Sequence, residues 1–205
     1  MSSSSSTRDT VLVSGGAGYI GSHVVRQLCE AGEQVVVLDD LSTGFRSAVP
    51  EGLLVTGNTG DRDLVTALLA GHKVTTILHF AAHTIVPESV SDPLKYYGNN
   101  TCATRNLLEC AVRAGVSNFI FSSTAAVYGI PANGIAAEDT PTAPINPYGS
   151  SKLMSEWMLR DIDLAHPMRH VSLRYFNVAG ADPGGRIGQS TRKATLLTKV
   201  ACEAA

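Results

Sequence analysis

The chain has 205 residues, of which 44% are apolar, and a formal net charge of −2 at pH 7 with histidine neutral. This length allows one large globular domain or one domain plus a fragment, and the composition fits a buried core. Because no basic block stands out, nucleic acid and anionic membranes are poor candidate partners. No apolar run in the sequence approaches the roughly 18 residues that a membrane helix needs. The serine-rich residues 1–9 are expected to form a disordered tail and not a signal peptide.

Four cysteines, Cys29, Cys102, Cys110 and Cys202, lack any spacing typical of metal ligands. No metal site is therefore expected. We interpret the cysteines as reduced, small hydrophobic residues of a cytoplasmic protein.

The segment from Thr10 to His23 (TVLVSGGAGYIGSH) begins as an apolar run, breaks into glycines and continues with a helical pattern. Strand, glycine turn and helix form the context in which such a run indicates dinucleotide binding, although an ordinary strand-to-helix turn gives the same letters. Gly15 permits the tight turn, Gly18 lets backbone approach a pyrophosphate, and Gly21 lets helix and strand pack closely. The start of the helix offers free N–H groups to phosphates.

A second apolar run, residues 35–38, ends in Asp39, about 20 residues after the glycines. A carboxylate at this place accepts hydrogen bonds from both ribose hydroxyls and repels a 2′-phosphate, which favours NAD over NADP. Asp40 could share this role, but we prefer to interpret it as an aspartate that starts a loop.

Short apolar runs alternate with helical patterns along the whole chain. Strands are expected at residues 11–13, 35–38, 53–56, 76–80, 118–122 and 171–175, and helices at 22–31, 61–70, 93–114 and 147–166. This alternation predicts an α/β fold with a doubly wound parallel sheet, a Rossmann-type NAD-binding domain over residues 10–205. Right-handed crossovers favour the strand order 3-2-1-4-5-6, and ligands then lie at the carboxyl ends of the strands.

Residues that directly follow the third and fourth runs are candidates for cofactor contact. Asn58 and Thr59 could reach an adenine edge, or they could form a plain turn. Small residues after His79 would let a flat cofactor lie against the backbone, while His79 itself is expected to be a buried, hydrogen-bonded histidine. Asn99 and Asn100 are poor helix formers within a helical pattern. They could hydrogen-bond the strand-end loops or serve a purely structural role.

The fifth run ends in Ser122-Ser123-Thr124, whose hydroxyls could bind a substrate hydroxyl. Further on, Pro147 suits the first position of a helix. Tyr148 and Lys152 then lie at i and i+4 on one helical face. An ammonium near a phenol lowers the tyrosine pKa, which would make Tyr148 a general base near neutral pH.

These segments together resemble the extended short-chain dehydrogenase/reductase family and, within it, the UDP-glucose 4-epimerases (UDP-galactose 4-epimerases). The resemblance is carried by VSGGAGYIGSH, LDDLSTG, HFAA with VPESVSDPLKYYGNN, FSSTAAVYG, INPYGSSK and LRYFNVAGADPGGRIGQ, from about residue 11 to 189. The TDE triplet of the related sugar-nucleotide dehydratases is absent, since Thr124-Ala125-Ala126 stands in its place.

The resemblance also implies roles for individual residues. It implies NAD contacts from Gly15, Gly18, Tyr19, Ile20, Gly21, Asp39, Asn58, Thr59, Phe80, Ala81, Ala82, Tyr148, Lys152 and Tyr175. Asp40, Asn99 and Ser122 are further candidates for cofactor contact, and Ser122 also matches a position beside the reacting sugar. Thr124, Tyr148 and Asn177 would contact the UDP-sugar, and Phe176 would lie beside the nicotinamide. Asn58 stands where the family usually has aspartate, and Thr84 where some epimerases carry lysine against the nicotinamide ribose.

The implied activity is NAD-dependent 4-epimerisation of a UDP-sugar such as UDP-galactose or UDP-glucose. Tyr148 would remove the C4 hydroxyl proton with help from Thr124, and Lys152, Tyr148 and Thr124 would form the catalytic set. NAD would be regenerated in each cycle and therefore retained. Two alternatives stay open: another nucleotide-sugar enzyme of the same superfamily (a dehydratase or decarboxylase), and a truncated, non-catalytic NAD-binding remnant.

Members of this family continue into a smaller C-terminal domain that grips the uracil and diphosphate. We therefore expect that this substrate domain is largely absent from the 205 residues. The family often forms homodimers through a helix pair, for which residues 93–114 and 147–166 are the candidates.

Overall fold

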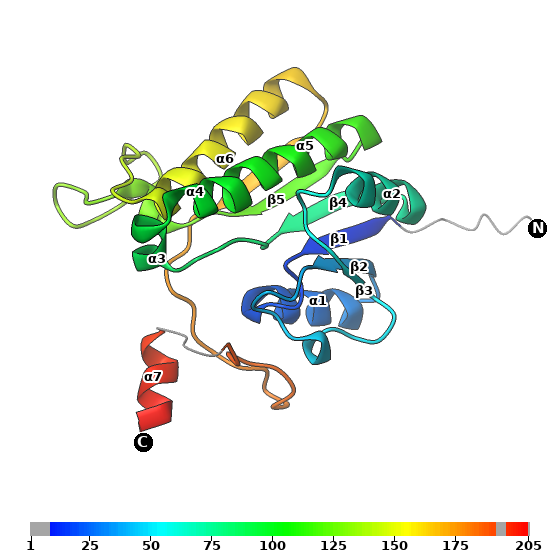
Figure 1. The fold of residues 1–205 in the computed structure, drawn as a ribbon, viewed down its shortest axis with the longest axis horizontal. Coiled ribbons are helices and arrows are strands. Elements are labelled where there is room, and N and C mark those ends of the chain that lie inside the picture. Colours follow the sequence, from blue (N-terminus) through cyan, green and yellow to red (C-terminus); the bar gives the residue numbers. More distant parts are fainter. Residues whose placement is uncertain (1–8, 192–195, 205) are drawn as a thin grey trace, which may run out of the picture.

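A computed structural model describes residues 9–191 and 196–204 of the chain, so the expected tail lies almost wholly outside the described residues (Figure 1). The strands are β1 (Thr10–Ser14), β2 (Gln34–Asp39), β3 (Leu54–Thr56), β4 (Val74–His79), β5 (Asn118–Ser122) and β6 (Arg169–Leu173). They form one parallel sheet in the order β3-β2-β1-β4-β5-β6. The predicted fold class and strand order are confirmed.

Helices connect the strands, and their bounds differ from the predicted ones in informative ways. They are α1 (Tyr19–Glu30), α2 (Arg62–His72), α3 (Val86–Ser91), α4 (Pro93–Tyr96), α5 (Ala103–Ala114), α6 (Pro147–Ala165) and α7 (Leu197–Ala204). The single helix expected at 93–114 is wrong in detail, because a π-helical turn, Tyr97–Cys102, separates α4 from α5. That turn contains the two asparagines, whose side chains compete for backbone hydrogen bonds. The sequence patterns also missed α3 and the 3₁₀ turns Arg46–Ala48 and Ala125–Tyr128.

The last strand of the sheet lies two residues earlier than predicted. Arg169 pairs with Asn118, and the ladder ends at Leu173 opposite Ser122. Arg174 and Tyr175 therefore lie beyond the strand, at the edge where ligands bind in such sheets.

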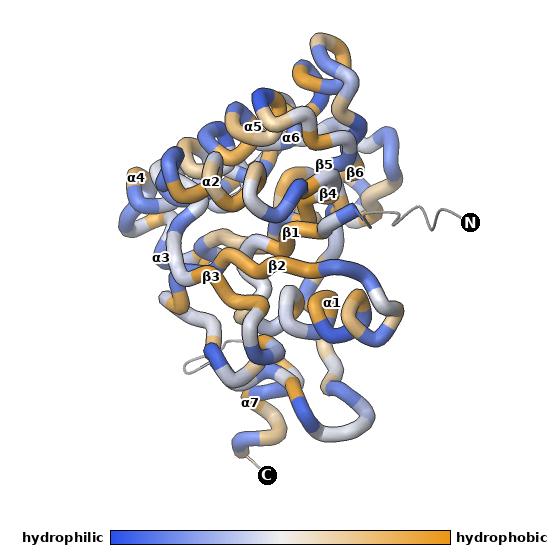
Figure 2. Tube along the Cα trace, turned by 90° about the vertical axis from the view of Figure 1, so that its right-hand side faces the viewer, coloured by the Kyte–Doolittle hydropathy of each residue, from blue (hydrophilic) through white to orange (hydrophobic). Residues whose placement is uncertain are grey.

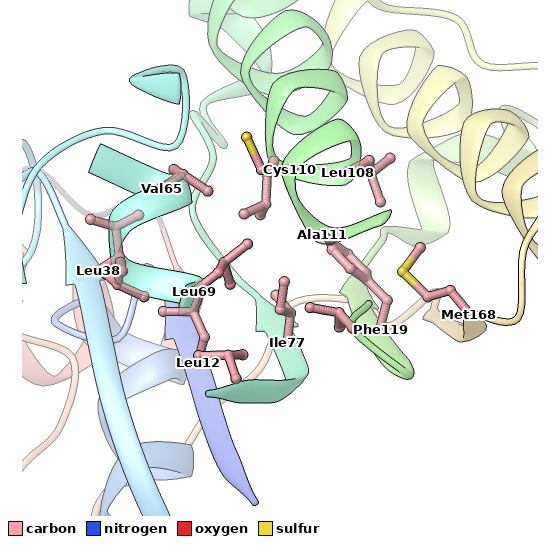
Figure 3. Packing of buried hydrophobic residues seen from close by; sticks show 14 of the residues in the cluster. Leu12, Leu38, Val65, Leu69, Ile77, Leu108, Cys110, Ala111, Phe119 and Met168 are labelled. Carbon is pink, nitrogen blue, oxygen red and sulfur yellow. The ribbon is translucent and has the colours of Figure 1, made fainter. Parts of the chain in front are cut away.

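The larger core lies between the sheet and the helices α2, α5 and α6 (Figure 1). Leu12, Ile77 and Phe119 from the strands pack there against Leu69 of α2 and Leu108 of α5 (Figure 3). Burying each such side chain contributes about 1.5–3 kcal/mol of stability. Figure 2 shows the apolar residues gathered along β1 and β2 at the centre of the molecule.

A smaller cluster covers the opposite face of the sheet, where Val25 of α1 packs with Val13 and Val37. All four cysteines are free, but only Cys110 is fully buried. The interpretation as small hydrophobic residues is wrong for Cys102 and Cys202, which lie exposed on the helical surface. In residues 9–191 and 196–204, no helix is long and apolar enough to cross a membrane.

The strand order reverses between β1 and β4, and this switch point positions the site. The Gly15 amide donates to the Leu38 carbonyl at 2.8 Å, which joins the end of β1 to β2. On the other side, the amides of Phe80 and Ala81 donate to the Ser14 carbonyl at 2.8 and 3.1 Å. Backbone ends of three strands therefore meet at one crevice, the usual place for a ligand in a doubly wound sheet.

Candidate active site

The glycine turn after β1 has no room for side chains. Gly15 has φ +74°, and a Cβ there would lie 2.4 Å from the Ala81 amide nitrogen. A Cβ on Gly21 would lie 2.2 Å from the Gly15 carbonyl oxygen. Gly18, the N-cap of α1, gives no side-chain hydrogen bond to the first turn, whose N–H groups lie at the positive end of the helix dipole.

A groove runs along the carboxyl ends of β1 to β4, directly beside this turn. Most of the residues predicted to contact a cofactor line it. Its walls are Gly15, Gly18, Leu38, Asp39, Asp40, Ser42, Thr43, Gly57, Asn58, Thr59, Phe80, Ala81, Ala82, His83 and Asn99. Sequence reasoning missed Ser42, Thr43 and His83, although each follows the carboxyl end of a strand.

Asp39 is held in one orientation at the floor of the groove. Its Oδ2 accepts a hydrogen bond from the Ala17 amide at 2.9 Å, and its Oδ1 accepts one from the Leu41 amide at 2.8 Å. Burial raises the Asp39 pKa, and the two backbone hydrogen bonds oppose this effect. Each carboxylate oxygen keeps a second acceptor direction, so a diol can still bind.

Asp40 organises the mouth of the groove, in line with the preferred interpretation as a loop-starting aspartate. It accepts hydrogen bonds from the Ser42 amide at 2.9 Å and from the Asn58 side-chain amide at 3.0 Å. Partial burial raises the Asp40 pKa, but these hydrogen bonds outweigh it and leave the pKa lowered. The Asn58 carbonyl oxygen accepts from the Gly60 amide at 2.8 Å, so Asn58 is fixed at both ends of its amide.

The buried histidine at the end of β4 is a structural residue, as predicted. His79 Nδ1 bonds to the Ser14 hydroxyl at 2.6 Å, and Nε2 bonds to the Thr104 hydroxyl at 2.8 Å. Burial, with a smaller effect from the charge of Lys152, lowers the His79 pKa to about 3. The imidazole is therefore neutral at physiological pH and ties β1 and β4 to α5.

Asn100 links the loop after β4 to α6. Its Oδ1 accepts from the His83 amide at 2.8 Å, and its Nδ2 donates to the His83 carbonyl at 2.9 Å and to the Ser151 hydroxyl at 3.1 Å. Asn99 lines the groove and donates to the Asn100 side chain at 3.2 Å. The asparagines are expected either to hydrogen-bond the strand-end loops or to have a purely structural role. Asn100 does hydrogen-bond such a loop, the one after β4.

The N-terminus of α6 presents the predicted tyrosine and lysine. Asn146 caps the helix by accepting from the Gly149 amide at 2.8 Å, and Pro147 occupies the first position as predicted. Lys152 is only 2% exposed, and its Nζ donates to the Ser122 carbonyl at 2.8 Å. The ammonium group lies 4.9 Å from the centroid of the Phe121 ring, a favourable cation–π distance.

Burial dominates the ionisation of both residues. It lowers the pKa of Lys152 to about 7. It also raises the pKa of Tyr148, and the hydrogen bond with the Thr124 hydroxyl only partly opposes that effect. The expectation that Lys152 lowers the Tyr148 pKa is therefore wrong for this structure: desolvation disfavours the charged form of each group, and the Lys152 ammonium points to the Ser122 carbonyl.

Three more predicted residues complete the cluster at the ends of β5 and β6. Thr124 is 8% exposed, and its Oγ1 accepts from the Ala126 amide at 3.1 Å. The hydroxyls of Ser122 and Tyr175 form a short hydrogen bond, and the Tyr175 carbonyl accepts from the Ala125 amide at 3.1 Å. The structure thus brings Ser122, Thr124, Tyr148, Lys152 and Tyr175 together.

A few predicted residues lie away from this cluster. Tyr19 lines a second hollow and donates its hydroxyl to the Gly180 carbonyl at 2.6 Å. Ile20 is partly buried in the first turn of α1, while Phe176 and Asn177 lie exposed after β6, Phe176 with 76% of its surface open. Across the described residues, no group of three or more His, Cys, Asp or Glu could hold a metal ion.

A model of the NAD dependent epimerase/dehydratase family matches residues 11–204. The chain belongs to this family. Among curated members, the UDP-glucose 4-epimerase of Azospirillum brasilense is 56% identical over 195 residues, which cover 95% of this chain and 56% of that protein. The chain spans little more than half the length of such relatives.

Solved epimerase structures share the fold over the same region. A crystal structure of a UDP-glucose 4-epimerase superposes with a TM-score of 0.93 at 41% identity, covering 96% of this chain and 60% of the other. The UDP-glucose 4-epimerase from Brucella ovis, in complex with NAD, gives a TM-score of 0.88 at 43% identity, covering 91% and 57%. The similarity therefore extends over the groove and over the Tyr148–Lys152 cluster.

Proposed function

We propose that this chain supplies the NAD-binding and catalytic half of an epimerase that interconverts UDP-galactose and UDP-glucose at C4. The observation that carries the proposal is the meeting of Tyr148, Thr124 and Lys152 at the carboxyl ends of the sheet. A hydroxyl, a phenol and a buried amine at such a site form the set that removes a proton from an alcohol during its oxidation. The membership of the family and the identity to UDP-glucose 4-epimerases support the same reaction.

The residues of the groove fit a dinucleotide. Gly15 and Gly21 let the backbone come close, and the first turn of α1 offers N–H groups to a pyrophosphate. Asp39 would accept hydrogen bonds from the adenosine ribose, and its charge would disfavour a 2′-phosphate, so NAD is the proposed cofactor. When bound, NAD⁺ supplies an acceptor for the C4 hydride and then its donor.

The side chains of the cluster would handle the proton. Tyr148, as tyrosinate, would accept the proton of the C4 hydroxyl and later return it, and the Thr124 hydroxyl would share that hydrogen bond. Lys152 would act beside them by holding the end of β5 in place, since its Nζ donates to the Ser122 carbonyl at 2.8 Å. The short bond between the Ser122 and Tyr175 hydroxyls ties the end of β5 to the segment after β6.

Pairing of two copies through α4 and α6 is part of the proposal. Leu94 on α4 and Trp157 and Leu164 on α6 are 79%, 47% and 84% exposed. Apolar side chains on neighbouring helices are typical of a surface that a partner covers. The cytoplasmic location stays a prediction.

Product identity tests the proposed reaction. Purified chain with NAD⁺ is incubated in turn with UDP-galactose, UDP-glucuronate and UDP-N-acetylgalactosamine, and the products are separated and weighed by mass spectrometry. We expect UDP-glucose from UDP-galactose, with unchanged mass. Loss of water would indicate a dehydratase, and loss of carbon dioxide a decarboxylase. No conversion by a chain that still binds NAD⁺ would indicate a non-catalytic remnant.

A further inference from the structure

An ion pair between a buried carboxylate and a partly exposed guanidinium joins α6 to the end of β6. Glu156 is 7% exposed, and its carboxylate faces the guanidinium of Arg174. Arg174 Nε lies 3.0 and 3.1 Å from the two carboxylate oxygens, and Nη2 lies 2.6 Å from Oε2. The Ser123 hydroxyl donates a short hydrogen bond to Oε1 of the same carboxylate.

Arg174 reaches one more segment. Its Nη1 donates to the Tyr128 hydroxyl at 3.1 Å, and its guanidinium carbon lies 5.0 Å from the centroid of the Tyr128 ring. The hydrogen bond to Glu156 raises the already high Arg174 pKa further, so Arg174 remains charged. We call Glu156, Arg174, Ser123 and Tyr128 the clamp.

Each member of the clamp is close in sequence to a residue of the candidate site. Ser123 lies between Ser122 and Thr124, and Tyr128 ends the 3₁₀ turn that the Thr124 side chain caps. Glu156 follows Lys152 by one turn of α6, and Arg174 directly precedes Tyr175. The clamp therefore fixes the spacing of three segments that carry the proton-handling groups.

Stability alone gives a weak reason for such a pair. Removing the Glu156 carboxylate from water is costly, and replacing a buried ion pair by apolar residues is often neutral or stabilising. The pair instead restricts the relative position of α6 and the segment after β6. The planar guanidinium can donate hydrogen bonds to both carboxylate oxygens only within a narrow range of positions.

We propose that the Glu156–Arg174 pair is a positioning device, which holds Thr124, Lys152 and Tyr175 in register without touching substrate or cofactor. This proposal rests on the proposed function, since the three residues that the pair holds in position belong to the proposed catalytic and cofactor site. A displacement of about 1 Å at an active site can cost about 100-fold in rate.

The test compares four variants of the chain with the wild type, all assayed well below their unfolding temperatures. Arg174→Lys keeps the charge but loses the planar group that donates to both carboxylate oxygens. The double variant Glu156→Leu/Arg174→Met removes both charges, so that neither is left unpaired. Glu156→Gln weakens the pair. Glu109→Gln is the matched control, because Glu109 also binds arginines, Arg62 of α2 and Arg105 and Arg113 of α5, and none of them belongs to the clamp.

The readouts are kcat and KM with UDP-galactose, the dissociation constant of NAD⁺, and the unfolding temperature. We expect Arg174→Lys and the double variant to lower kcat by about 100-fold with little change in KM. We also expect them to weaken NAD⁺ binding by a factor on the order of ten, through Lys152 and Tyr175. Glu109→Gln should keep wild-type kcat, KM and NAD⁺ affinity.

Two results would overturn the proposal. One is a folded Arg174→Lys variant with wild-type kcat and NAD⁺ affinity. The other is recovery of wild-type kcat and affinity in the double variant, which would leave the pair a role in folding alone. If the wild-type chain forms no UDP-glucose, the proposed function fails, and the NAD⁺ dissociation constants of the same variants still decide whether the clamp positions the site.

Discussion

Tyr148→Phe is expected to lower kcat for UDP-galactose by about 100- to 10,000-fold, the usual contribution of a general acid–base residue. Phenylalanine keeps the ring that packs beside Tyr96 but cannot take the C4 proton from the substrate. The fold should persist, because the substitution removes a single oxygen atom and keeps the ring in place beside Tyr96. Steady-state rates, circular dichroism and NAD⁺ calorimetry are the measurements.

The pH profile sharpens this prediction. Because tyrosinate is the active form and burial raises the Tyr148 pKa, wild-type kcat should rise as pH increases. The residual rate of Tyr148→Phe should lack this rise. A variant that keeps wild-type turnover, or the same ascending limb, would remove Tyr148 from the proposed mechanism.

Gly15→Ala is expected to destabilise the chain by about 2–5 kcal/mol and to abolish NAD⁺ binding at micromolar cofactor. A left-handed conformation costs a non-glycine residue about 1–2 kcal/mol. The new Cβ would also lie 2.4 Å from the Ala81 amide nitrogen, and relieving such an overlap costs about 1–3 kcal/mol more. To relieve this overlap, the end of β1 would have to move away from the end of β4, which would change the shape of the groove.

A second glycine separates these two effects. Gly115 has φ +73°, close to that of Gly15, but a Cβ there meets nothing within 4 Å. Gly115→Ala should therefore cost only the about 1–2 kcal/mol of backbone strain and leave NAD⁺ affinity unchanged. Urea unfolding and calorimetry of both variants measure the difference. Equal destabilisation by the two substitutions, with NAD⁺ affinity intact, would show that close packing at Gly15 is unimportant.

Sequence patterns were sufficient for the features that depend on local spacing. Alternating strands and helices predicted the sheet order, because chirality restricts how such units connect. The i, i+4 spacing of Tyr148 and Lys152 placed both at one end of α6, and the strand ends located the groove.

Features that depend on contacts between distant residues escaped prediction. Glu156 and Arg174 are 18 residues apart, and nothing in their local sequence pairs them. The raised Tyr148 pKa results from burial, which depends on the packing of whole elements around the phenol. The π-helical turn at Tyr97–Cys102 has a helical sequence pattern, and Asn100 within it bonds to His83 and Ser151, partners that its local sequence does not indicate.

The fate of the hydrogen at C4 tests the central proposal most directly. Purified chain and substoichiometric NAD⁺ are incubated with UDP-galactose deuterated at C4, and the product is analysed by mass spectrometry and NMR. We predict UDP-glucose that keeps the deuterium at C4, because the hydride leaves and returns within one bound cycle while Tyr148 moves only the hydroxyl proton. Absence of UDP-glucose from a chain that binds NAD⁺, or UDP-glucose with hydrogen from solvent at C4, would contradict the account.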